Sequence, residues 1–79
     1  MVIAKVKKEG KDYGEEIKIS SLEDIEEILC RVAGAAVLAG DERVEVEFSC
    51  NGDKVVLKGY SEIKRKLKEY KFLKKIFNL

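Results

Sequence analysis

Four lysines near the end of the sequence are spaced so that together they could bind an anion. Lys64, Lys68, Lys71 and Lys75 follow at i, i+4, i+7 and i+11, so in one continuous helix they line one side. The segment 61–79 carries seven Lys or Arg residues against two acids. These four lysines are the candidates for binding nucleic acid or another polyanion. The alternative is that acids of the same chain, Glu23, Glu26 and Glu27, neutralise them.

Composition favours the second of these interpretations. The net charge is only +1, which gives little long-range attraction to phosphate. The chain has three arginines, although arginine is the residue that most often reads bases and binds phosphate in a bidentate manner. None of the three tyrosines is interleaved with the lysines as a base-stacking platform requires.

The sequence gives no sign of catalytic or cofactor chemistry. It contains no histidine, which removes the usual general base and the commonest metal ligand. Neither glycine-rich phosphate-binding motif occurs. We therefore expect no enzyme activity, no catalytic or cofactor-binding residues, no metal site and no cofactor. The two cysteines, Cys30 and Cys50, are interpreted as partly buried thiols, with a disulfide between them or a redox or intersubunit role as the alternatives.

The elements that position these residues follow from apolar periodicity. Alternation predicts two strands, 2–8 and 15–20, and a helix follows from Ser20 or Ser21, with a buried stripe and a stop at Gly40. A second hairpin, 43–50 with 54–60, turns at Asn51-Gly52, and a final helix spans 61–79 with Ser61 as its cap. The stripe of the first helix is predicted to be Leu22, Ile25, Ile28, Leu29, Val32 and Ala36, and that of the second Ile63, Leu67, Tyr70, Leu73 and Phe77.

These elements predict an α+β fold for a single domain over 1–79. The order β-β-α-β-β-α gives a four-stranded antiparallel sheet from two hairpins, with two helices on one face. The halves 1–40 and 41–79 resemble each other enough to suggest a pseudo-repeat, although two amphipathic helices with the same period explain the match equally well.

Two apolar stretches lead to the functional hypothesis. The segment 32–39 has no polar face, so Val37 and its small neighbours contact either the rest of the fold or a partner. Phe72, Ile76 and Leu79 fall beside the main stripe of the last helix and either close over the core or form a docking patch. We therefore expect a small domain that acts by protein–protein interaction and self-associates as a homo-oligomer such as a homodimer, with nucleic-acid binding by the basic helix as the alternative.

The remaining expectations concern the surroundings of the protein. No stretch is long and apolar enough for a membrane span, and the first residues do not form the apolar centre of a signal peptide. We therefore expect a cytoplasmic protein without a membrane partner. Enrichment in Lys and Glu, with few amides, is a tendency of thermophilic proteins.

Overall fold

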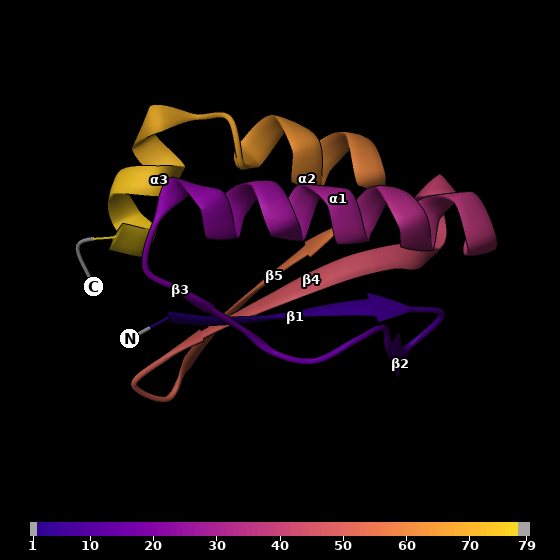
Figure 1. Ribbon diagram of the computed structural model, residues 1–79, viewed down its shortest axis with the longest axis horizontal. Coiled ribbons are helices and arrows are strands. Elements are labelled where there is room, and N and C mark those ends of the chain that lie inside the picture. The colour runs from indigo at the N-terminus through magenta and orange to yellow at the C-terminus, as the bar shows by residue number, and fades with distance from the viewer. Residues whose placement is uncertain (1, 78–79) are drawn as a thin grey trace.

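The computed structural model describes residues 2–77, with the side chains of Tyr70 and Phe77 left aside, and shows one antiparallel sheet covered by helices on one face (Figure 1). The fold class is α+β, as predicted. The elements are β1 (Val2–Lys8), β2 (Lys11–Asp12), β3 (Ile17–Ile19), α1 (Leu22–Ala39), the 3-10 helix η1 (Asp41–Arg43), β4 (Val44–Cys50), β5 (Asp53–Lys58), α2 (Tyr60–Lys66) and α3 (Tyr70–Phe77).

The sheet has five strands where four were predicted, because the second strand of the first hairpin is divided. The strand order is β2-β1-β4-β5, and β3 also pairs with β1. β2 pairs with the end of β1 and β3 with its beginning. Between these two pieces Tyr13 still donates a backbone hydrogen bond to the carbonyl of Val6, at 2.8 Å, but residues 14–16 are not part of a strand, so the predicted strand 15–20 is reduced to Ile17–Ile19. β1 and β4 therefore form the centre of the sheet.

The second hairpin turns at Asn51-Gly52, as predicted. Asn51 and Gly52 both adopt the positive φ angles that a type I′ turn requires, 48° and 91°. Phe48 lies opposite Val55, and Val46 lies opposite Leu57. Because side chains alternate along a strand, all four point toward the helices, where Phe48, Val46 and Leu57 are buried.

α1 begins at a well-formed cap and supplies one half of the helical layer. The carboxylate of Asp24 accepts hydrogen bonds from the backbone N–H groups of Ser20 and Ser21, at 2.7 and 2.9 Å. These bonds and the hydroxyls of both serines lower the pKa of Asp24. The helix packs against β1, β3, β4 and α2. Its buried residues are Ile25, Ile28, Val32, Ala35 and Ala36, whereas Leu22, which was predicted to belong to this stripe, is 64% exposed.

The predicted final helix 61–79 is wrong as a single element, because the chain forms α2 and α3 with a turn between them. Gly59, not Ser61, is the cap of α2. At the turn, Lys68 and Glu69 donate backbone hydrogen bonds to the carbonyls three residues earlier, at 3.2 and 3.1 Å. This tightening ends the α-helical ladder. α3 therefore starts in a new direction and covers the end of the sheet (Figure 1).

The core lies between the sheet and the three α-helices. Its members from the last part of the chain are Ile63 on α2, Leu67 at the C-terminal cap of α2 and Ile76 on α3, at 0%, 2% and 5% exposure. Ile63 and Leu67 were predicted to face the core, whereas Ile76 was placed outside the main stripe. No helix in residues 2–77 is long and apolar enough to cross a membrane.

Candidate functional site

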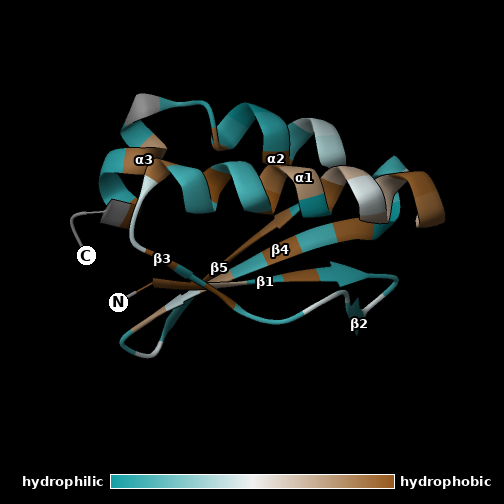
Figure 2. Ribbon diagram, viewed as in Figure 1, coloured by the Kyte–Doolittle hydropathy of each residue, from teal (hydrophilic) through white to brown (hydrophobic). Residues whose placement is uncertain are grey.

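The outer side of α1 changes from acidic to apolar along its length. Glu23, Glu26 and Glu27 occupy its beginning, where the helix dipole stabilises negative charge. Its end exposes two large apolar side chains, with Val37 85% and Leu38 65% exposed. The hydropathy colouring of Figure 2 shows the last turn of α1 as hydrophobic. We call this surface the α1 apolar end and define it as Cys30, Ala33, Val37 and Leu38.

The chain's own residues account for part of the small-residue segment 32–39. Ala35 and Ala36 are buried against the core. A Cβ atom added to Gly34 would lie 3.3 Å from the hydroxyl oxygen of Tyr13, so Gly34 allows that tyrosine to approach the helix. Val37 was predicted as an interface candidate and is exposed, as such a role requires. Leu38 was missed, although it falls off the buried stripe that runs through positions 25, 28, 32 and 36.

Of the other interface candidates, Phe72 and Ile76 contact their own chain. Ile76 is 5% exposed. The ring of Phe72 packs edge-to-face against that of Phe48, with centroids 5.6 Å apart and an angle of 72° between the planes. Phe72 and Ile76 therefore close over the end of the core, which is one of the two arrangements considered for this side of the last helix. Leu79 lies outside the described residues.

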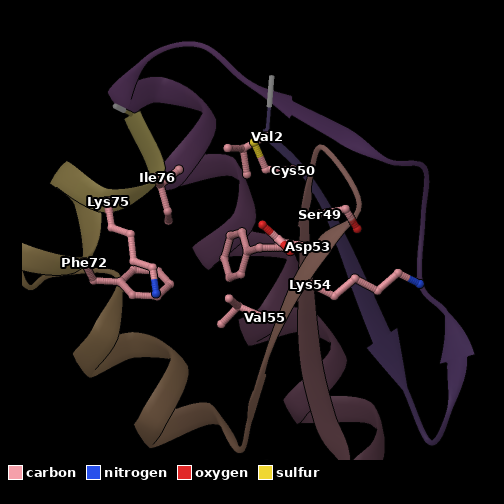
Figure 3. A pocket seen from close by; sticks show the side chains of 10 residues that line it. Val2, Ser49, Cys50, Asp53, Lys54, Val55, Phe72, Lys75 and Ile76 are labelled. Carbon is pink, nitrogen blue, oxygen red and sulfur yellow. The ribbon is translucent and has the colours of Figure 1, made fainter. Parts of the chain in front are cut away.

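A cavity of about 350 Å³ lies between α3 and the tip of the β4–β5 hairpin (Figure 3). In Figure 3 the amine of Lys54 points away from the cavity. Asp53 points into it and Lys75 extends across it beside Phe72. The volume suits a small ligand. The walls are mostly apolar and comprise Val2, Phe48, Ser49, Cys50, Asp53, Lys54, Val55, Phe72, Lys75 and Ile76.

The two cysteines are separate, free thiols. Cys30 is exposed on α1, whereas Cys50 is buried at the end of β4, where it lines the cavity. The structure thus contains no Cys30–Cys50 disulfide, but the prediction of partly buried thiols is wrong for Cys30, which is exposed because it lies on α1 away from the buried stripe. No group of acidic or cysteine side chains within residues 2–77 is arranged to hold a metal ion.

The four candidate lysines are exposed but do not lie along one helix. Lys64 is on α2, Lys68 is in the turn, and Lys71 and Lys75 are on α3. The Lys64 amine lies 5.8 Å from the ring centre of Tyr60. Because the helix ends at residue 66, the single line of lysines that supported polyanion binding is broken.

The acids of α1 do not neutralise these lysines by direct contact. In the part of the chain that the structure describes, no ion pair joins α1 to any of the four. Glu27 pairs instead with Arg31 of its own helix. Arg65 forms ion pairs with Glu62 and Glu69, at 2.8 and 3.0 Å, and these carboxylates raise the pKa of Arg65. The expected neutralisation by the first helix is therefore limited to long-range effects.

The sheet face that no helix covers carries alternating charges. Glu47 is the centre of this network, since its carboxylate lies 3.3 Å from the Lys54 amine and 3.4 Å from that of Lys7. The hydrogen bond from Lys54 and the positive charge of both lysines lower the pKa of Glu47. A carboxyl held in its ionised form in this way is a structural ion-pair partner rather than a general acid.

No family model, curated protein or solved structure matches the chain.

Proposed function

We propose that this chain is a non-enzymatic interaction domain that self-associates through the α1 apolar end. The observation that carries the proposal is the exposure of Val37 and Leu38, at 85% and 65%. Two large apolar side chains on adjacent positions, next to the half-exposed Ala33 and the exposed Cys30, form a patch rather than an isolated apolar residue.

The shape of this surface suits a second copy of the same helix. Ala33 is small, so the backbone of another helix can approach closely at this point, with Val37 filling the space beside it. Two helices that cross near Ala33 with an inclination of about 50° bring their apolar ends together. Their acidic beginnings then diverge, which keeps the repulsion between Glu23 and Glu26 of the two copies small.

A two-fold pair of this kind would be isologous, because each copy offers the same patch to the other. The surface is small, so we expect a weak dimer that dissociates on dilution. Burying Val37 and Leu38 supplies the attraction, at about 25 cal/mol for each Å² of apolar surface removed from water. The association also increases the buried apolar surface of a chain whose 79 residues place it near the lower size limit for a domain that is stable by itself.

Sedimentation equilibrium over a range of concentrations tests the proposal. We expect the average mass of the wild type to rise from 9.0 kDa toward twice that value. The Val37→Gln, Leu38→Gln double variant is expected to remain at 9.0 kDa. Leu22→Gln is the matched control, because Leu22 is 64% exposed at the other end of the same helix and should not affect the mass.

The proposal is wrong if the wild type remains monomeric up to about 1 mM, the concentration at which even a weak interface is populated. It is equally wrong if Leu22→Gln removes the association and the double variant retains it.

A further inference from the structure

β5 is an open edge of the sheet. β4 is its only strand partner among the described residues, and the six residues of β5 form the longest continuous edge, since the opposite edge is shared by β2 and β3. The backbone N–H of Gly59 donates to the carbonyl of Val44 at 2.9 Å, so these two residues form a hydrogen-bonded pair. Such pairs alternate with non-hydrogen-bonded ones along an antiparallel ladder. The non-hydrogen-bonded pairs are therefore Glu45–Lys58, Glu47–Val56 and Ser49–Lys54.

The alternation fixes which backbone groups are free to bind another strand. In β5, Lys54, Val56 and Lys58 turn their N–H and C=O groups away from β4 and toward the open edge. All three are exposed, with Val56 at 45% and the Lys54 side chain at 65%. Their side chains share the sheet face opposite the helices, in the order cation, apolar, cation.

This order disfavours a second copy that pairs symmetrically about Val56 as the occupant of the edge. Two β5 strands that pair about a two-fold axis at Val56 place Lys54 of each copy directly opposite Lys58 of the other. Like charges in this position repel, and lysines on edge strands are a common device against self-pairing. The same two lysines attract a strand with acids at the matching positions.

We propose that the β5 edge binds an extended acidic segment of a partner protein with the pattern acidic-x-apolar-x-acidic. The added strand runs antiparallel to β5, its apolar residue lies beside Val56, and its acids lie beside Lys54 and Lys58. β4 shows the same complementarity on the inner side of β5, where Glu45 lies opposite Lys58 and Glu47 pairs with Lys54 at 3.3 Å. The proposal does not depend on self-association, because it uses a different layer of the molecule.

Labelled synthetic peptides test this inference on the unmodified protein. The probe is an acetylated heptapeptide, Thr-Glu-Thr-Val-Thr-Glu-Thr, titrated by fluorescence anisotropy at low salt, and we expect saturable binding below about 1 mM. A peptide with Lys in place of both Glu residues is expected to bind at least about ten-fold more weakly, because it repeats the repulsion between lysines. An acidic peptide with N-methyl groups on the residues that donate to β5 is expected to lose binding to a similar extent, about ten-fold.

Amide hydrogen exchange locates the bound strand. The amide hydrogens of Lys54, Val56 and Lys58 are expected to exchange about ten-fold more slowly in the complex. Those of Val55 and Leu57 already belong to the ladder with β4 and should change less. A charge-reversed protein, Lys54→Glu with Lys58→Glu, is expected to prefer the lysine peptide, and its circular dichroism establishes that it is folded.

Three results would each overturn the inference. The first is that the acidic peptide does not bind. The second is that the N-methylated peptide binds equally well, which would show that charge alone attracts the peptide. The third is that the protected amides lie outside β5 instead of within it.

Discussion

The contact between Phe48 and Phe72 determines whether the last helix closes over the core, and a double-mutant cycle measures it. The rings meet edge-to-face with their centroids 5.6 Å apart. An aromatic pair in this geometry contributes about 1 kcal/mol beyond the apolar surface that it buries. Replacing either phenylalanine by leucine keeps most of the apolar surface but removes the ring pair. We therefore expect Phe48→Leu and Phe72→Leu to be coupled by about 1 kcal/mol.

The assay is urea denaturation of the wild type, both single variants and the double variant, each at several protein concentrations. Concentration-independent midpoints show that the stability measured belongs to the monomer. For a domain of 79 residues, a loss of 1 kcal/mol lowers Tm by about 4–8 °C, so a thermal melt gives a second reading.

The control cycle combines Phe48→Leu with Val37→Ala. The end of α1 and the turn between β4 and β5 lie at opposite ends of the molecule (Figure 1), so these changes should be additive within about 0.5 kcal/mol. Additive effects for Phe48 and Phe72 would refute the reasoning. α3 would then not hold Phe72 against β4, and Phe72 would become a candidate for contact with a partner.

Three further predictions concern the stability of the fold. Ile28→Ala is expected to cost about 3–4 kcal/mol in urea denaturation, since Ile28 is 0% exposed, whereas Leu38→Ala at 65% exposure should cost less than about 0.5 kcal/mol. Gly59→Ala is expected to lower the free energy of unfolding by about 1–3 kcal/mol in the same assay, because φ at this position is +88°. An added Cβ would lie 3.9 Å from the nearest atom, the carbonyl oxygen of Asp41, so the loss comes from backbone strain and not from a steric clash. The folded protein lowers the pKa of Asp24, so the ionised carboxylate stabilises the fold at pH values above the ordinary carboxyl pKa. This contribution is lost as the pH falls through the lower pKa of the folded state. The stability of Asp24→Asn should therefore fall less steeply than that of the wild type in an acid titration.

The elements with strong local signals were predictable from the sequence. Asn51-Gly52 determines the turn and therefore the register of β4 with β5, because two-residue loops with positive φ angles leave one arrangement of the flanking strands. The alternation of apolar residues then decides which face of the sheet is buried. The beginning of α1 was likewise indicated by the serine and aspartate of its cap.

The break between α2 and α3 could not be predicted in the same way. Residues 67–69, Leu-Lys-Glu, are all good helix formers, and no glycine or proline interrupts them. A straight helix over 61–79 would extend about 28 Å and carry Ile76 away from the core. The burial of Ile76 at 5% exposure shows that tertiary packing overrides local preference here.

Strand order also depends on long-range contacts, and it decides which surfaces remain available. Local patterns identify β5 as a strand but do not show that β1 takes the other side of β4 and leaves β5 at the edge. Once the strand order is known, Lys54 and Lys58 are seen to lie on an edge strand, which the composition does not reveal. They are edge residues that discourage pairing between copies and favour an acidic strand.

The same reasoning separates the two proposed surfaces. α1 packs over β1, β3 and β4, and α2 packs over β4 and β5, so a second copy bound at the α1 apolar end leaves the β5 edge free. Attraction at the first surface comes from Val37 and Leu38 and should change little with salt. Attraction at the second depends partly on Lys54 and Lys58 and should weaken as ionic strength rises. At the β5 edge, Lys54 and Lys58 lie beside backbone groups that add directional hydrogen bonds, so the salt dependence of peptide binding distinguishes this surface from the α1 apolar end.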